Sequence, residues 1–145
     1  MQLTKQTDFA FRILLYLAAQ PADKLSNIQE ICDYYQISQS HLSKIVMKLA
    51  RLGYVVAYRG KGGGIAMAVD PTEINVADIV ENFEPTLRLV NCKDPLCLID
   101  PTCRLKHILH QSMTDFLDGL RRYQLSDLMD HETTALILKD PVEER

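Results

Sequence analysis

Several features are missing from this chain of 145 residues, and each absence excludes a class of protein. Residues 1–8 hold no basic segment followed by an apolar run and a small-residue cleavage site, so we expect no secretory signal peptide. The apolar stretch over residues 9–19 is interrupted by Arg12 and is too short to cross a membrane. We therefore expect a cytoplasmic protein with no membrane partner. In that compartment clustered thiols serve metal or redox chemistry more often than structural disulfides.

Acidic residues are absent between Asp33 and Asp70. The basic residues of this interval are Lys44, Lys48, Arg51, Arg59 and Lys61. The net charge of −3 conceals the segregation: residues 1–64 carry eight basic and four acidic side chains, whereas residues 65–145 carry eight and fifteen. A local excess of positive charge indicates a polyanion-binding face, the alternative being a chance fluctuation on a solvated surface.

The sequence also lacks the usual patterns of enzymes and nucleotide-binding proteins. The glycine-rich residues 59–64 do not match a nucleotide-binding fingerprint, and they lie between two predicted strands rather than between a strand and a helix. One nucleophile and base stand at helical spacing, Cys103 and His107, but no oxyanion site accompanies them. We therefore expect no enzyme.

Three of the four cysteines, Cys92, Cys97 and Cys103, are concentrated in residues 91–105. Thiolates are soft ligands, and a compact loop stiffened by two prolines suits an iron–sulfur cluster or zinc. Such sites normally need four ligands, so the loop is one ligand short. Alternatives are a zinc site completed by His107, a metal-free thiol switch that forms disulfides, or buried apolar fillers.

Apolar periodicity predicts three helices, over residues 5–20, from Ser26 to about Tyr35 and from Gln39 to about Leu52. Ser26 and Gln29 form a capping-box pattern at the start of the second helix, on whose inner face Cys32 is expected to be a core residue. The second and third helices, joined by a tight turn, have the helix-turn-helix arrangement. The polar face of the third helix carries candidate DNA-reading residues, namely Gln39, Ser40, His41, Lys44 and Lys48.

Two predicted strands, residues 54–58 and 65–69, flank the glycine-rich turn and form a β-hairpin wing. Arg59 or Lys61 at its tip would enter a DNA minor groove. The predicted fold is thus mainly α-helical with a small β-hairpin: a winged helix-turn-helix over residues 1–70, then a cysteine loop and a long dimerisation helix over residues 71–130.

The second half of the chain begins with a predicted short helix near Val76–Phe83. The long helix is expected to be capped by Thr102 and to end near Arg122. Its apolar stripe could pack on the first helix, but we favour the seam of a homodimer. We expect residues 131–145 to form a flexible tail.

These features resemble the winged-helix iron–sulfur repressors of the IscR/NsrR family, and most closely its nitric-oxide-sensing members. The resemblance covers residues 1 to about 130. It rests on residues 1–4, 53–55, 59–64, 84–85, 89–92 and 101–106, together with Leu125, Asp127 and Leu128. Four and then five residues separate the three cysteines, a spacing that is specific when it follows a winged helix.

The resemblance implies a ligand set and a mode of action. Cys92, Cys97 and Cys103 would hold the cluster, with Asp8 of a partner subunit as fourth ligand. His107 is the alternative, although three residues separate it from Cys103 where related proteins with a histidine ligand have two. Four such positions can hold a 4Fe–4S cluster, which we favour, or a 2Fe–2S cluster.

The implied function is that of a homodimeric repressor on double-stranded DNA with a palindromic operator. Nitric oxide would nitrosylate the cluster, release the DNA and derepress genes of the nitrosative-stress response. A regulator that responds to redox or iron–sulfur status, and a cluster-free thiol switch, are the alternative functions.

Overall fold

The first three helices follow the apolar periodicity of the sequence. In the computed structural model, which describes residues 1–139, they are α1 (Lys5–Ala19), α2 (Ile28–Tyr35) and α3 (Gln39–Arg51). The predicted stripe of α3 is buried, and the helix packs on both α1 and α2. Cys32 is 3% exposed and belongs to this core, as expected.

The entry to α2 differs from the predicted capping box. Asn27, not Ser26, caps the helix, because its side-chain oxygen accepts from the Gln29 N–H at 2.9 Å. Ser26 instead exchanges two backbone hydrogen bonds with Ile65, at 2.9 and 2.8 Å. Pairing with the wing therefore takes Ser26 out of the helix.

The predicted wing is present as an antiparallel hairpin of β1 (Val55–Tyr58) and β2 (Gly64–Met67). Val55 lies opposite Met67, and Tyr58 lies opposite Gly64. A side chain at Gly64 would place its Cβ 2.8 Å from the Ser26 carbonyl oxygen. Glycine is thus required where the wing meets the segment before α2.

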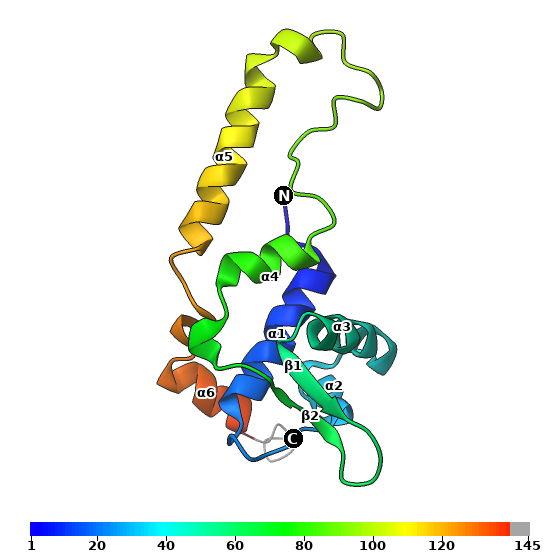
Figure 1. The fold of residues 1–145 in the computed structure, drawn as a ribbon, viewed down its shortest axis with the longest axis vertical. Coiled ribbons are helices and arrows are strands. Elements are labelled where there is room, and N and C mark those ends of the chain that lie inside the picture. The colour runs from blue at the N-terminus through cyan, green and yellow to red at the C-terminus, as the bar shows by residue number, and fades with distance from the viewer. Residues whose placement is uncertain (140–145) are drawn as a thin grey trace.

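Two further helices follow the wing. α4 (Val76–Phe83) has the predicted bounds, and α5 (Arg104–Leu120) stands away from the rest of the molecule alongside the cysteine loop (Figure 1). The predicted cap of α5 is wrong by one residue, because Thr102 ends a 3-10 turn, Asp100–Thr102, and Cys103 takes the N-cap position.

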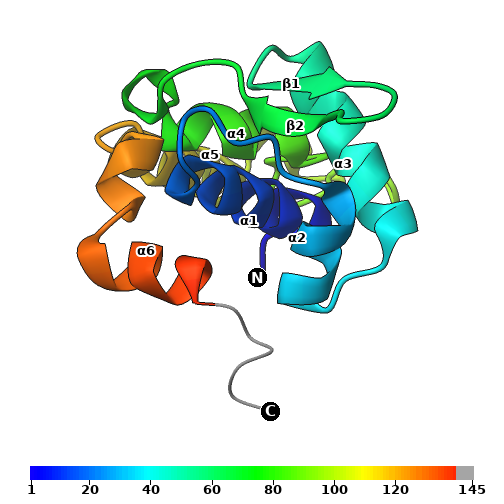
Figure 2. The same ribbon diagram turned by 90° about the horizontal axis from the view of Figure 1, so that it is seen from below.

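The C-terminal segment forms a helix where a flexible tail was expected. α6 (His131–Leu138) is capped by Asp130, whose side chain accepts from the Thr133 N–H at 2.6 Å. It lies against α1 (Figure 2), and Ile137 is 7% exposed within the core. Residues 140–145 of the expected tail lie outside the described residues.

The core continues past residue 70, where we expected the DNA-binding region to end. Ile74, Phe83, Leu125 and Ile137 belong to the same buried cluster as the side chains of α1 to α3. The helix-turn-helix is therefore built on the elements that lead into and out of the cysteine loop and α5.

Candidate nucleic-acid interface and cysteine loop

The exposed side chains of α3 form a stripe along the helix. Ser40 and Lys44 are exposed, as predicted, and so are Met47 and Arg51 further along; Met47 is 71% exposed. Residues three or four apart share one face of a helix, so these four side chains are neighbours. Met47 and Arg51 were missing from the predicted set, although the same spacing leads to them. Gln39 is also exposed, in the first turn.

Two of the predicted DNA-reading residues also contact neighbouring elements. The His41 ring, which is exposed, lies 6.3 Å from the Phe9 ring of α1. Lys48 Nζ donates to the Asn82 carbonyl at 2.5 Å and lies 4.5 Å from the centre of the Phe83 ring. The Lys48 ammonium is thus held against the end of α4.

The wing adds positive charge beside α3. Arg59 and Lys61 are exposed at the tip of the hairpin, where Gly60 and Gly62 adopt φ values of 90° and 78°. Because α3 packs on β1, the helix and the wing form one continuous unit. This unit carries no acidic residue between Asp33 and Asp70, so its field attracts phosphates.

Consecutive turns fold the cysteine loop. The Cys97 N–H donates to the Cys92 carbonyl, and the Asp100 N–H donates to the Cys97 carbonyl, both at 3.1 Å. Cys92, Cys97 and Cys103 are half-buried, and none of the cysteines within residues 1–139 is in a disulfide. The loop therefore presents three accessible thiols from one short segment.

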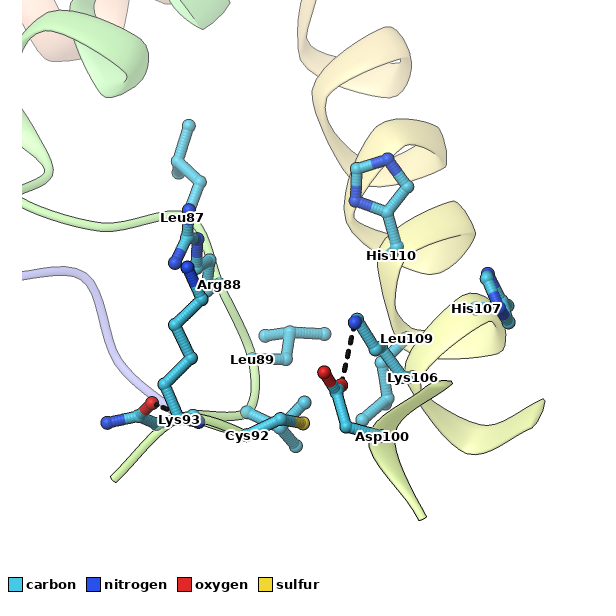
Figure 3. Close-up of a pocket in the computed structure, with 12 residues that line it drawn as sticks. Leu87, Arg88, Leu89, Cys92, Lys93, Asp100, Lys106, His107, Leu109 and His110 are labelled. Atoms are coloured by element: carbon cyan, nitrogen blue, oxygen red, sulfur yellow. Dashed lines mark hydrogen bonds and ion pairs between the residues drawn. The ribbon is translucent and has the colours of Figure 1, made fainter. Parts of the chain in front are cut away.

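Cys92 lies next to an ion pair. Lys106 Nζ is 2.6 Å from Asp100 Oδ1, and this hydrogen bond is the main cause of the lowered pKa of Asp100 (Figure 3). Burial raises the pKa of the Cys92 thiol, and the charge of Asp100 and a hydrogen bond to it raise the pKa further, against the opposing charge of Lys106. These effects favour the protonated Cys92 thiol, which donates a hydrogen bond to Asp100.

A cavity of about 430 Å³ opens beside Cys92, between residues 87–93 and α5. Its basic lining residues include Arg88, Lys93, Lys106 and His110. His107 also lines this cavity, and in Figure 3 its ring is turned away from the Cys92 sulfur. His107 therefore stays the alternative to Asp8 as the ligand that would complete a site with the loop thiols.

Asp8 is paired within its own helix. Its two carboxylate oxygens contact the Arg12 guanidinium at 3.0 and 2.9 Å. Arg12 in turn lies over the rings of Phe9 and Tyr35, 5.9 and 5.6 Å from their centres. The structure thus joins Asp8 to α2 through Arg12 and does not bring it to the loop of its own chain.

The donor chemistry of the loop fits an iron–sulfur cluster, but one chain does not complete the site. Three half-buried, unpaired thiols are the ligands such clusters use. In the part of the chain that the structure describes, no three histidine, cysteine or acidic side chains are arranged to hold a metal ion. The three loop thiols are therefore not gathered into a metal site within the described part of one chain.

Glu84 fastens the start of α1 to the start of the loop. One of its carboxylate oxygens accepts from the Thr4 N–H at 2.7 Å, from Thr4 Oγ1 at 3.1 Å and from Thr7 Oγ1. Burial raises the pKa of Glu84, but the hydrogen bonds from Thr7 and Thr4 together outweigh it, so the pKa is lowered. Asp8 belongs to the turn held in this way, since its N–H donates to the Thr4 carbonyl at 3.1 Å.

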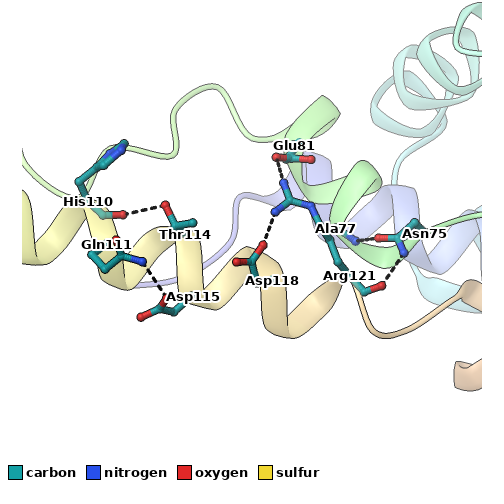
Figure 4. A network of polar contacts seen from close by, with 9 residues as sticks. All are labelled: Asn75, Ala77, Glu81, His110, Gln111, Thr114, Asp115, Asp118 and Arg121. Carbon is teal, nitrogen blue, oxygen red and sulfur yellow. Dashed lines mark hydrogen bonds and ion pairs between the residues drawn. The ribbon is translucent and has the colours of Figure 1, made fainter.

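One face of α5 is apolar and uncovered. Leu105 and Ile108 are 59% and 57% exposed, and Leu117 is the one buried residue of the helix. The helix is anchored at its C-terminal end, where Arg121 contacts Glu81 at 2.7 Å and its carbonyl accepts from the Asn75 side chain at 2.9 Å (Figure 4).

None of the helices within residues 1–139 has the length and apolar content needed to cross a bilayer.

The helix-turn-helix, the wing and the basic stripe define a winged-helix DNA-binding transcriptional regulator, not an enzyme. The sequence matches the model of the Rrf2 family, described as iron-dependent transcriptional regulators, over residues 3–131, and the chain belongs to this family. Among curated proteins it is 43% identical to the HTH-type transcriptional regulator NsrR of Halalkalibacterium halodurans, over 91% of this chain and 92% of that protein.

A second relative and a solved structure agree with this assignment. The regulator NsrR of Bacillus subtilis is 42% identical over 95% of this chain and 97% of its own length. The structure of CymR, the global cysteine regulator of Bacillus subtilis, superimposes with a TM-score of 0.71 over 88% of this chain and 95% of its own, at 20% identity. That last similarity shows the shared fold.

Proposed function

We propose that this protein is a homodimeric repressor that senses nitric oxide through an iron–sulfur cluster. Cys92, Cys97 and Cys103 of one subunit and Asp8 of the partner subunit would hold the cluster, 4Fe–4S in preference to 2Fe–2S. The observation that carries the proposal is the cysteine loop: three half-buried thiols from one short segment, which form no complete metal site within residues 1–139. The similarity to regulators named NsrR supports it.

The uncovered face of α5 supports the dimer. Exposed Leu105 and Ile108 lie on the helix that begins at Cys103, so pairing of two such helices would bring the loop of one subunit near the body of the other. Burying such a face removes apolar surface from water at roughly 25 cal/mol per Å². The dimer thus completes the metal site and covers α5 together.

In this proposal Asp8 is the ligand that exchanges. When bound, the cluster supplies iron that reacts with nitric oxide. Asp8 has two possible partners, the metal and Arg12, which it contacts at 2.9 Å in this structure. A carboxylate is a hard ligand on a site otherwise made of soft thiolates, so it is the ligand most easily exchanged. Its return to Arg12 would change the contacts that Arg12 makes with Tyr35, at the end of α2.

The DNA-bound state uses the α3 stripe and the wing. Two copies of α3, related by the dimer axis, would lie in successive major grooves of a palindromic operator. Exposed side chains of α3 would face the bases and phosphates, namely the predicted Gln39, Ser40, His41 and Lys44 together with Met47 and Arg51. At the tip of the wing, Arg59 or Lys61 would reach the minor groove. Action on DNA would place the protein in the cytoplasm.

The test is operator binding by the anaerobically purified, iron-loaded protein before and after stoichiometric nitric oxide. Iron and sulfide counts and visible absorbance give the cluster content. We expect affinity for the operator to fall at least tenfold on exposure. Unchanged affinity with a demonstrably nitrosylated cluster would overturn the proposal. A colourless protein that contains zinc would show that the thiols hold zinc and not an iron–sulfur cluster.

Two variants decide the fourth ligand. Asp8→Ala is expected to shorten the lifetime of the cluster under a chelator while part of the thiol-bound iron remains. His107→Ala is the comparison variant, because His107 is the alternative fourth ligand. If His107→Ala shortens the lifetime and Asp8→Ala leaves it unchanged, the assignment of Asp8 is wrong.

A further inference from the structure

We propose that the last turn of α4, residues 82–84, couples the cysteine loop to the recognition helix α3, and that Lys48 is a positioning residue of α3 and not a phosphate contact. The inference rests on the proposed function, because it concerns how events at the loop reach the DNA-binding surface. It is carried by three consecutive residues that contact two other helices, α3 and α1.

The first contact joins this turn to α3. Lys48 Nζ donates to the Asn82 carbonyl at 2.5 Å and lies 4.5 Å from the centre of the buried Phe83 ring. The carbonyls at the C-terminal end of a helix carry partial negative charge, and an aromatic face attracts a cation. The ammonium is held by two independent attractions, both of which it would lose by turning toward a phosphate.

The second contact joins the same turn to α1. Glu84, the residue after Phe83, accepts hydrogen bonds from Thr4 and from the fully buried Thr7. These threonines form the first turn of α1, which also contains Asp8. Pro85 then begins the segment that runs to Cys92. The turn therefore lies at the root of the loop and touches the helix that carries the exchangeable ligand.

Phe83 makes the two contacts mechanically dependent on each other. Its side chain is 1% exposed and packed in the core that α1, α3 and α4 share. Because packed cores change between discrete arrangements and do not deform smoothly, a shift of the loop root would move Asn82 and Glu84 together. Lys48 would transfer that shift to α3, one helical turn from the exposed Lys44.

Lys44 and Lys48 provide a matched pair for the test, because both lie on α3 and carry the same charge. The measurement is the operator dissociation constant of the iron-loaded and the metal-free protein, each at several salt concentrations, for wild type, Lys48→Met and Lys44→Met. For Lys48→Met we expect the ratio of operator affinities, iron-loaded over metal-free, to fall about fivefold, which is the low end of allosteric coupling. The slope of log affinity against log salt should not change.

Lys44→Met should behave in the opposite way. Loss of one phosphate contact lowers the slope of log affinity against log salt by about one and leaves the affinity ratio unchanged. Lys48→Arg is expected to restore the ratio, because a guanidinium can also donate to the Asn82 carbonyl and stack on Phe83.

The proposal is overturned if Lys48→Met lowers the salt slope as Lys44→Met does, or if it leaves the affinity ratio at the wild-type value. Should Lys48→Met fail to fold, the same measurement is made on Glu84→Gln, which weakens the contact between this turn and α1. A reduced ratio of iron-loaded to metal-free affinity supports the coupling, and an unchanged ratio rejects it. If wild type itself shows equal affinities with and without iron, the proposed function fails, which is a separate result.

Discussion

Glu84 shows how one side chain can hold together segments that are distant in the sequence. Three donors from Thr4 and Thr7 converge on one of its oxygens, and together they hold the pKa of Glu84 below its ordinary value in spite of burial. Thr4 forms no hydrogen bond of its own to cap α1, and Glu84 supplies the acceptor at that end of the helix. An anion at this end also matches the helix dipole.

Replacing Glu84 with Ala should lower the free energy of unfolding by about 2 kcal/mol at pH 7, because it leaves the buried Thr7 hydroxyl without its acceptor. The pKa of Glu84 is lower in the folded protein. Its contribution is therefore present above the ordinary glutamate pKa and is lost as the pH falls through the lowered, folded-state value. Urea denaturation across the acid range should give a flatter pH dependence for the variant.

The control for this prediction is Glu73→Ala, which removes an exposed glutamate elsewhere in the chain. It should leave both the stability and its acid dependence near the wild-type values. Equal pH profiles for Glu84→Ala and wild type would show that Glu84 titrates normally.

At the scale of the element, α5 leaves an apolar face uncovered, whereas the short helix α6 buries Ile137 in the core. α6 packs on α1, and the Tyr34 hydroxyl donates to the Leu136 carbonyl at 3.0 Å. α5 contacts α4 near its C-terminal end and leaves its apolar face open. The difference predicts opposite consequences of mutation in the two helices.

In α5, Ile108→Glu should dissociate the dimer, because a carboxylate would be buried at the centre of the proposed seam. Sedimentation measurements at micromolar protein should find monomer. Gln111→Glu, which adds the same charge at an exposed polar position of the same helix, should stay dimeric. A dimeric Ile108→Glu variant would place the interface elsewhere.

In α6, Ile137→Ala should lower the free energy of unfolding by about 2–4 kcal/mol through loss of a buried side chain. Leu136→Ala is the internal comparison: Leu136 is 62% exposed and should cost less than about 0.5 kcal/mol. Denaturant unfolding of both variants makes the measurement. Equal effects would mean that α6 does not pack on α1 in solution.

At the scale of the whole molecule, the two halves of the chain carry opposite net charge. The basic α3 stripe and wing occupy one part, and the acidic second half of the chain includes the loop and α5. In a dimer joined through α5, the α3 stripe and wing of each subunit would contact the same face of a DNA duplex. This arrangement requires half-sites whose centres are about 34 Å apart, or a multiple of that distance.

Inserting about five base pairs between the operator half-sites should abolish tight binding, since half a helical turn puts the second site on the opposite face of the DNA. Inserting about ten should restore part of it. Mobility-shift titrations with the iron-loaded protein make the comparison. Tight binding at all spacings would show that the two subunits read DNA independently.

Local pattern was enough to predict the helices, the hairpin and the cysteine loop, because each has its own periodicity or turn residues. It failed where a distant partner decides. Ser26 has the sequence of a cap but pairs with Ile65, and the hydrogen bond from Lys48 to the Asn82 carbonyl joins residues 34 positions apart. α6 was missed because its eight residues have little amphipathic pattern and are ordered by contacts with α1 and Tyr34.

The uncovered face of α5 has a consequence for how such a protein would work in a cell. If two chains must meet before the loop finds its fourth ligand, the fraction of chains able to keep iron depends on how many copies are made. Copy number would then be an input to the sensor alongside nitric oxide. A repressor acting on its own promoter would thereby adjust the threshold at which it responds.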